Sequence, residues 1–537
     1  MNRRVFYSTR ISYLSSLIFL LCVLGLGLPF CEVNAYAGDK ARSRAERALR
    51  DGDLELAEKL YREILEQNAS DNEARLGLSY TLYKMRDLRS AFDHAARVVA
   101  RDPLSARAHA LLGTVVLATG DFRLSVEEFR TALSLNENEA LAVAGLAMVD
   151  FYENRLQSSF VLLRRAVELD SREPDFLYSF AQTAARTERF REAAAAYERF
   201  LIVAPHTDAD RRARIRGLIE FMKYLSSQSR LYTLDGEDSV TVPFEVVNNR
   251  PIIKIRINGL KEPLRFVLDT GSGMCVVSEE TARRLGLRSV ARGGQARAVG
   301  GGGRFEIVYG FLTSLAIGGA RVENVPVYIR RFFEDGTHVD GYIGLSVINK
   351  YITTVDYGTK TFSLARQQDT TETPLGVSAP GSIDIPIRTT SSGFLSGEVQ
   401  LEGIKKPLNF IVDTGASVSV VAESVAAHED MNRYEQDLRM RIYGAAGVAE
   451  NVKVLLLPRL TLGSLVRERI SAAVLDLNPI NETTGFVQSG IIGGNFLSHF
   501  RLTFDFRRGV LSLDPLVPVG SESERTAPEG EANVRQP

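Results

Sequence analysis

Two short loops with the same chemistry stand 144 positions apart (413 − 269) in this 537-residue chain. An apolar run over residues 266–268 leads into Asp269-Thr270-Gly271, and a similar run over 410–412 leads into Asp413-Thr414-Gly415. Two carboxylates held close together resist ionising at the same time, so they share one proton. One of them can then take a proton from a water molecule while the other polarises a carbonyl group. The two loops therefore predict a hydrolytic site in which Asp269 and Asp413 are the catalytic residues.

The residues that flank the aspartates have separable roles in such a loop. Threonine hydroxyls can cross-brace the two loops, and glycines let backbone amides approach the carboxylates without a Cβ in the way. Only the first loop has a hydroxyl directly after its glycine, so the two aspartates are expected to be inequivalent. Which of them is the base stays open, because a coupled pair titrates as a unit. We assign supporting roles to Thr270, Gly271, Ser272, Thr414, Gly415, Ala416 and Ser417.

The two loops lie inside a duplicated frame. Residues 259–266 align with residues 403–410 at the same offset, and two further motifs recur at an offset of 149 (493 − 344). Short runs that alternate apolar and polar residues, such as 251–259, predict strands in both halves. The recurring motifs are Tyr342-Ile343-Gly344 with Ile491-Ile492-Gly493, and Thr354-Val355-Asp356-Tyr357 with Thr503-Phe504-Asp505-Phe506.

Both halves resemble the retropepsin and pepsin clan of aspartic peptidases, on the paired loops and the paired downstream motifs. The resemblance covers about residues 240–514 and implies two β-barrel lobes that form a pepsin-like pseudo-dimer, without a metal or an organic cofactor. It implies that two motifs lie behind the active-site loops: Ile343, Gly344, Ile492 and Gly493. It also implies that a mobile flap occupies a glycine-rich stretch in each half, which includes Gly300, Gly301, Gly302, Gly303, Tyr443, Gly444 and Gly447.

The stretch from about Ala45 to Tyr224 repeats with a period of 34 residues (91 − 57). Small residues at one position of each repeat let paired helices approach closely, as in stacked helical arrays. These residues are Ala57, Ala91, Ser125, Ser159 and Ala193. The pattern resembles the tetratricopeptide family, with about five repeats and a capping helix over residues 207–224, although the chain has no tryptophan. The resemblance implies a concave surface that binds a protein partner.

The sequence thus predicts a multidomain chain, with an N-terminal tetratricopeptide α-solenoid followed by two tandem retropepsin-like lobes. A stretch rich in Thr, Pro, Gly and Ser indicates a linker between the lobes. The polar tail is expected to be disordered. The predicted boundaries are a signal peptide at 1–37, repeats at 38–228, the first lobe at 232–366, the linker at 367–382, the second lobe at 383–516 and the tail at 517–537.

The N-terminus has the pattern of an export signal. Three arginines precede an apolar stretch over residues 14–30, and Ala35-Tyr36-Ala37 has the small-residue spacing that a signal peptidase reads. We therefore expect export to a bacterial periplasm or cell envelope. An uncleaved membrane anchor through residues 14–30 is the alternative, because that run is close to the lower length limit for spanning a bilayer.

Composition excludes several other classes of function. Lys plus Arg (65) nearly cancels Asp plus Glu (66), which gives no basic excess for binding nucleic acid. The six histidines form no metal-ligand spacing, so we expect no metal site. Two of the three cysteines lie in or beside the export segment, which leaves Cys275 as an expected buried structural thiol.

The leading interpretation is an exported aspartic endopeptidase with both loops in one folded chain, in which the helical array recruits protein substrates or partners. Since catalysis needs one free proton in the site, we expect a mildly acidic pH optimum. Two alternatives stay open. Each half could pair with its counterpart in a second chain, or the β-rich halves could form a peptide-binding scaffold that no longer cuts. The sequence does not specify the natural substrate or the cleavage preference.

Overall fold

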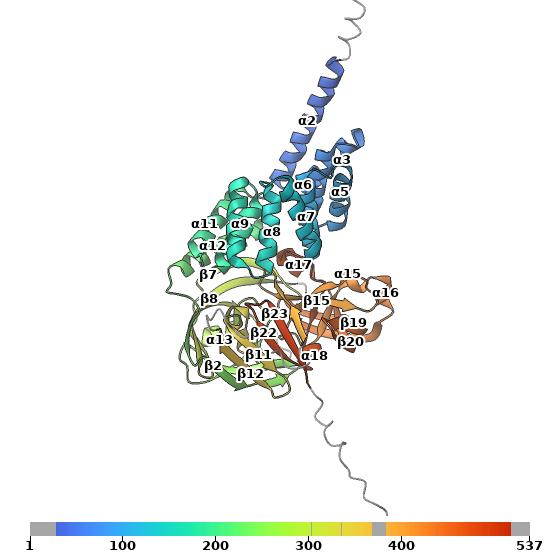
Figure 1. Cartoon of the computed structure of the whole chain (residues 1–537). Coiled ribbons are helices and arrows are strands. Elements are labelled where there is room, and N and C mark those ends of the chain that lie inside the picture. Colours follow the sequence, from blue (N-terminus) through green and yellow to red (C-terminus); the bar gives the residue numbers. More distant parts are fainter. Residues whose placement is uncertain (1–27, 302, 334–335, 368–382, 517–537) are drawn as a thin grey trace, which may run out of the picture. The chain divides into compact units, whose positions relative to one another are not determined.

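The computed structural model describes residues 28–301, 303–333, 336–367 and 383–516 (Figure 1). The chain divides into two compact units, which we describe separately. The first contains the residues up to Gly145 together with Val203–Ala209, and the second contains Leu146–Ile202 and everything from Asp210 onward. Most of the predicted signal peptide, nearly all of the predicted linker and the tail lie outside the described residues.

The first unit consists of helices that pack in consecutive pairs. Asp53, Asp71, Asp87 and Asp121 each cap a helix by accepting a hydrogen bond from a backbone amide in its first turn. The repeated small residues of this unit are fully buried, which confirms the close helix approach that the 34-residue period predicted. The helices are α2 (Leu28–Asp51), α3 (Leu54–Gln67), α4 (Asn72–Lys84), α5 (Leu88–Arg101), α6 (Ala106–Thr119), α7 (Phe122–Leu135) and the start of α8 (Ala140–Tyr152).

The second unit begins with the last helices of the repeat region: the end of α8, α9 (Leu156–Leu169), α10 (Pro174–Arg186), α11 (Phe190–Val203) and α12 (Ala209–Ser226). Helix α12, predicted only as a cap on the repeats, packs closely on β7 (Ala291–Arg297) of the first lobe (Figure 1). A Cβ built on Gly217 would lie 2.2 Å from the carbonyl oxygen of Arg292. Among the described residues, none of the helices is both long and apolar enough to cross a membrane.

The first lobe is a nine-stranded sheet in the order β1-β9-β6-β10-β5-β4-β8-β7, with β3 on β4 and a further pairing of β8 with β9. The chain turns between its strands through the short helices α13 (Glu279–Arg284) and α14 (Leu345–Ile348). The strands not yet bounded are β1 (Thr233–Gly236), β3 (Glu245–Val247), β4 (Arg250–Ile257), β5 (Leu264–Leu268), β6 (Cys275–Ser278), β8 (Arg304–Ile317), β9 (Ala320–Arg330) and β10 (Gly341–Ile343).

The second lobe repeats this plan as an eight-stranded sheet in the order β14-β15-β16-β21-β17-β20-β19-β18, with a further pairing of β15 with β19. The strands are β14 (Arg388–Thr389), β15 (Leu395–Leu401), β16 (Leu408–Val412), β17 (Ser419–Ala422), β18 (Glu435–Gly444), β19 (Gly447–Leu462), β20 (Leu465–Leu475) and β21 (Gly490–Ile492). The helices are α15 (Glu423–Ala426), α16 (Glu429–Asn432), α17 (Asn478–Thr484) and α18 (Gly494–Leu497). The fold class of tetratricopeptide helices followed by two β-rich lobes is thereby confirmed.

A six-stranded sheet is shared by both lobes, in the order β13-β23-β22-β11-β12-β2. At its centre the duplicated Thr-x-Asp-x motifs pair with each other, and Thr354 lies opposite Thr503 with 3.2 Å between their Oγ1 atoms. The strands are β2 (Ser239–Pro243), β11 (Tyr351–Asp356), β12 (Thr361–Arg366), β13 (Ile383–Pro386), β22 (Phe500–Asp505) and β23 (Val510–Pro515). The shared sheet joins the two lobes along the motif that is duplicated.

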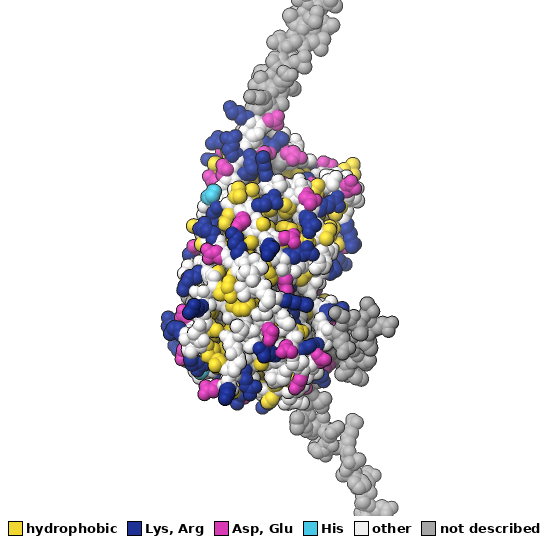
Figure 2. All heavy atoms as spheres, turned by 90° about the vertical axis from the view of Figure 1, so that its left-hand side faces the viewer, with side chains coloured by type: hydrophobic (Ala, Val, Ile, Leu, Met, Phe, Trp, Pro, Cys, Tyr) yellow, Lys and Arg dark blue, Asp and Glu magenta, His cyan; other side chains and the backbone are white. Residues whose placement is uncertain are grey.

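Surface charge on the face shown in Figure 2 is mixed rather than concentrated. In the view of Figure 2, Lys and Arg side chains alternate with Asp and Glu side chains, in keeping with a formal net charge of −1. That face offers no extended patch of a single sign for a polyanionic or polycationic partner.

Candidate active site

Both aspartates stand at the ends of buried parallel strands. Strand β5 pairs in parallel with β10, and β16 pairs in parallel with β21. The backbone amide of Asp269 donates to the carbonyl of Ile343 at 3.0 Å, and that of Asp413 donates to the carbonyl of Ile492 at 3.0 Å. In the structure, the two downstream motifs lie directly against the loops.

The two carboxyl groups lie side by side, each against the glycine of the other loop. A Cβ built on Gly271 would lie 2.3 Å from Cγ of Asp413, and one built on Gly415 would lie 2.7 Å from Oδ1 of Asp269. The two aspartates also share a side-chain hydrogen bond. Any other residue in place of either glycine would push the two carboxyl groups apart.

The threonines cross-brace the loops. Thr270 Oγ1 donates to the carbonyl of Val412 at 2.8 Å, and Thr414 Oγ1 donates to the carbonyl of Leu268 at 2.7 Å. Each backbone amide of the pair also donates to the hydroxyl oxygen of the other threonine, at 3.2 and 3.1 Å. Both threonines are buried, so these four bonds tie the loops together without competition from water.

Burial sets the protonation of the pair. It raises the pKa of Asp269 well above the ordinary value, and the neighbouring Asp413 raises it further, while the charge of Arg330 opposes the rise. Burial also raises the pKa of Asp413, opposed by hydrogen bonds from Asp269 and from the backbone amides of both loops. Because both shifts favour the neutral form, the pair retains a proton at pH values at which a free carboxyl group has lost it.

The environments of the two carboxyl groups differ. Oδ1 of Asp269 accepts from the Gly271 amide at 2.9 Å, whereas Oδ1 of Asp413 accepts from the amides of both Gly415 and Ala416, at 2.7 and 3.1 Å. Asp413 therefore has the stronger stabilisation of its anion within its own loop.

Ser272 and Ser417, to which supporting roles were assigned, make hydrogen bonds to groups other than the carboxylates. The Ser272 hydroxyl donates to the carbonyl of Met274 at 3.0 Å, so this bond turns away from Asp269. The carbonyl of Ser417 accepts from Nδ2 of Asn249 at 3.2 Å, across the two lobes. The difference between the aspartates thus comes from backbone amides rather than from the serine that the sequence indicated.

Behind the loops, a thiol in the first lobe takes the place of a hydroxyl in the second. The amide of Gly344 donates to Sγ of Cys275 at 3.4 Å, and the amide of Gly493 donates to Oγ of Ser419 at 3.1 Å. Burial raises the pKa of the Cys275 thiol to about 11. Cys275 is therefore neutral and unreactive at physiological pH, which fits the structural role expected for it.

The two glycine-rich stretches meet at the tips of two hairpins, β7–β8 and β18–β19. A Cβ on Gly300 would lie 2.7 Å from Cα of Gly444, and one on Gly444 would lie 2.2 Å from the carbonyl of Val299. Gly301 lies as close to the backbone of Gly447. Gly303 adjoins the carbonyl of Ala446, Tyr443 is partly exposed, and Gly302 lies outside the described residues. The two turns contact each other through backbone that only glycine allows.

No sequence pattern identified Arg330, a charged residue that influences one of the aspartates. Arg330 ends β9, and its charge acts on Asp269. In the sequence it reads as an ordinary polar strand residue beside Arg331, with no motif to single it out. Its proximity to the site depends on strand pairing that only the tertiary structure fixes.

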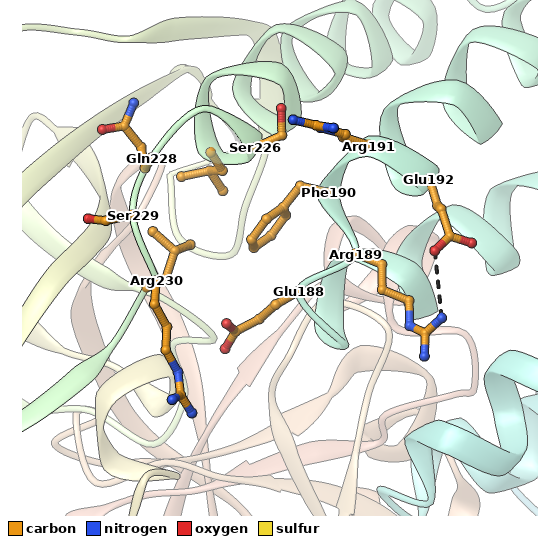
Figure 3. Close-up of a pocket in the computed structure, with 11 residues that line it drawn as sticks. Glu188, Arg189, Phe190, Arg191, Glu192, Ser226, Gln228, Ser229 and Arg230 are labelled. Carbon is orange, nitrogen blue, oxygen red and sulfur yellow. Dashed lines mark ion pairs between the residues drawn. The ribbon is translucent and has the colours of Figure 1, made fainter.

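The pocket in Figure 3 is separate from these loops. It has a volume of about 350 Å³ and lies between the start of α11 and the residues after α12. Arg189 and Glu192 form an ion pair of 3.6 Å at its side (Figure 3). It shares no residue with the aspartate loops. Among the described residues, no group of three or more His, Cys, Asp or Glu side chains is placed to hold a metal ion.

Comparison with known proteins yields matches in both regions of the chain. The Escherichia coli (strain K12) cytochrome c-type biogenesis protein CcmH is 32% identical over 123 residues, which cover 22% of this chain and 35% of that protein. The chain thus spans about a third of the length of the curated relatives it matches. Among solved structures, the tetratricopeptide protein TTC0263 of Thermus thermophilus is similar at 21% identity, with a TM-score of 0.30, over 34% of this chain and 98% of that one. MamA from RS-1 is similar at 19% identity, with a TM-score of 0.23, over 31% of this chain and 93% of that one.

Family models cover the two motif-bearing regions found above. Residues 253–347 and 397–496 match the model described as aspartyl protease, and residues 48–115 match the tetratricopeptide repeat model. Both aspartates, both threonines and both glycines fall inside the two protease segments. The chain therefore matches the tetratricopeptide repeat model in its helical region and the aspartyl protease model in both β-rich lobes.

Proposed function

We propose that this protein is an aspartic endopeptidase that hydrolyses peptide bonds with a water molecule held between Asp269 and Asp413. The observation that carries the proposal is the approach of the two carboxyl groups, each within contact distance of the glycine of the opposite loop. Their burial and mutual hydrogen bond give the shared proton that this chemistry needs.

In this mechanism the ionised aspartate takes a proton from the water while the protonated one donates a hydrogen bond to the scissile carbonyl oxygen. The resulting tetrahedral intermediate collapses as a proton passes to the leaving nitrogen. The threonine braces hold the carboxyl groups in register, so that no reorganisation is needed during the reaction. The better hydrogen-bonded Asp413 is the more easily ionised member, which favours it as the base in the first step.

A site within one chain is favoured over one shared by two chains. Both loops belong to the same unit, and the threonine hydrogen bonds and the shared sheet join the lobes of a single molecule. The same arrangement supports catalysis over a scaffold that no longer cuts, because a half-buried carboxyl pair costs folding free energy that binding alone would not require.

We further propose that the tetratricopeptide repeats recruit protein substrates or partners, and that the protein acts in the periplasm or cell envelope. The repeat match supports the first part, since such arrays commonly present a concave protein-binding surface. The arginines and the apolar stretch over residues 14–30 support the second. Secretion of a fusion of residues 1–40 to a periplasm-dependent reporter tests it, and retention of the reporter in the cytoplasm would contradict it.

The catalytic proposal is tested by digesting a denatured protein with the wild type, Asp269→Asn and Asp413→Asn. Each single variant is expected to cut at least about 10³-fold more slowly. Asp356→Asn is the matched control, because that carboxylate lies in the shared sheet and accepts hydrogen bonds only from a turn. We expect a mildly acidic pH optimum for the wild type. Equal cleavage by all four proteins would leave the proposal without support.

A further inference from the structure

Arg330 is a half-buried cation, and among the described residues it forms no ion pair. It is the last residue of β9, and it lies opposite Ser278 of β6. Its Nε is shielded from solvent and has no hydrogen-bond partner among the described residues. Its guanidinium instead lies near two aromatic rings, 5.5 Å from the ring centre of Phe305 and 5.9 Å from that of Phe332.

The two aromatic rings leave Nε of this guanidinium without a hydrogen-bond acceptor. Aromatic faces attract a guanidinium, but they do not replace the hydrogen bonds that its N–H groups make in water. The guanidinium has five such donors in a planar fork that matches the two oxygens of a carboxylate. Such a guanidinium keeps donors that suit the carboxylate of a bound peptide.

The surroundings of Arg330 place it on the first-lobe side of the candidate active site. Phe305 belongs to β8, which follows the glycine-rich turn that contains Gly300 and Gly301. Phe332 is the second residue after the end of β9. The charge of Arg330 also acts on Asp269 itself. The strand beyond the glycine-rich turn and the segment after β9 therefore converge on this guanidinium.

The second lobe carries an apolar residue at the equivalent position. Ser278 pairs with Arg330 in the first lobe, and Ala422 pairs with Leu475 at the same register in the second. Leu475 is buried in an apolar cluster with residues such as Ile411 and Val420. The two lobes thus differ in chemistry at this position, with a cation in the first and a buried aliphatic side chain in the second.

We propose that Arg330 binds a carboxylate of the substrate, so that the enzyme prefers peptides with an acidic side chain on the first-lobe side of the scissile bond. This inference rests on the proposed peptidase function. An acidic side chain and the C-terminal carboxylate of a peptide share the same chemistry. An endopeptidase cuts internal bonds, which favours the side chain as the group recognised.

The test begins with the full chain and a mixture of synthetic peptides blocked at both ends. Cleavages that are also seen with Asp269→Asn are subtracted. We expect Asp and Glu to be enriched at one position on one side of the cut bond. Peptides with Glu or Gln at that position are then compared at a pH of about 5.5, at which a free glutamate is ionised. The wild type is expected to cut the Glu peptide with about tenfold higher kcat/KM, and to gain nothing from unblocking the carboxyl end.

Substitution of Arg330 then assigns the preference. Arg330→Gln is expected to bring the Glu-to-Gln ratio of kcat/KM close to one, and Arg330→Lys to retain part of it. Arg331→Gln is the matched control, because Arg331 is the adjacent arginine but is exposed, and it is expected to keep the wild-type ratio. Cleavage of the Gln peptide by Arg330→Gln verifies that this variant is folded.

Two results would overturn the inference while leaving the peptidase function standing. One is Asp269-dependent cleavage with no preference between the Glu and Gln peptides. The other is a preference that survives in Arg330→Gln, whether or not that variant shifts the pH profile through Asp269. Absence of any Asp269-dependent cleavage would instead overturn the proposed function. In that case, binding of fluorescently labelled Glu and Gln peptides would be measured by fluorescence anisotropy. Equal affinity for the two peptides would overturn the proposed carboxylate site as well.

Discussion

Thr270 and Thr414 exchange hydrogen bonds between the two lobes, the backbone amide of each donating to the hydroxyl oxygen of the other at 3.2 and 3.1 Å. Each hydroxyl in turn donates to a carbonyl at the end of the opposite strand. This relationship converts two similar loops, far apart in the sequence, into one rigid centre.

Removing one of these hydroxyls should loosen that centre. In Thr270→Val, the amide of Thr414 loses its acceptor and the carbonyl of Val412 loses its donor, both in buried surroundings. Two unsatisfied buried groups cost about 2–6 kcal/mol together. We expect a lower Tm in thermal unfolding and a lower kcat/KM. Thr270→Ser keeps the hydroxyl and is the matched control; a valine variant as stable as the serine variant would show that the braces contribute little.

The aspartates should destabilise the fold more as pH rises. Burial raises the folded-state pKa of both, so the stability associated with their neutral forms is fully present below the unfolded-state pKa of about 4 and is lost as pH rises through the folded-state values. The double variant Asp269→Asn/Asp413→Asn cannot ionise there. Its Tm is therefore expected to exceed that of the wild type by a margin that grows from pH 4 towards neutral. A margin that shrinks over this interval would contradict the direction of the shifts.

The active-site glycines should tolerate no side chain. In Gly271→Ala, the new Cβ would lie 2.3 Å from Cγ of Asp413, so the carboxyl groups must separate. A displacement of about 1 Å at a reacting centre costs about 10²-fold in rate, and we expect at least that loss in kcat/KM. Gly397→Ala is the control, since its Cβ would meet nothing closer than 3.5 Å. Equal activity of the two alanine variants would mean that the aspartates do not need this close approach.

Helix α12 should hold the first-lobe hairpin that ends in the glycine-rich turn. Gly217 packs on the carbonyl of Arg292, and Asp210 pairs with Arg304 at 2.5 Å. In Gly217→Ala, the helix must move off β7, because the obstacle is backbone that cannot yield. We expect faster hydrogen exchange of the amides at residues 291–297.

Arg214→Gln provides the comparison for that experiment. It removes only an exposed hydrogen bond to the carbonyl of Gln295, which is expected to change exchange rates little. Exchange that rises equally in both variants, or in neither, would show that close packing at Gly217 does not hold the hairpin.

The sequence alone determined the parts that repeat or that follow a short local pattern. The 34-residue period gave the paired helices, because small residues must recur wherever helices approach closely. The duplicated Asp-Thr-Gly frame indicated both lobes and the residues that meet in the site, because the triplet recurs at one offset inside a longer repeat. The fold class follows from these two signals.

Only the tertiary structure decided which surfaces meet. Strand pairing places Thr354 against Thr503 and aligns Arg330 and Leu475 at equivalent registers, and such pairings depend on contacts between residues remote in the chain. The packing of α12 on β7 and the contact of the two glycine-rich turns are of the same kind. The difference between the aspartates also arises there, because it comes from backbone amides whose direction a sequence pattern does not specify.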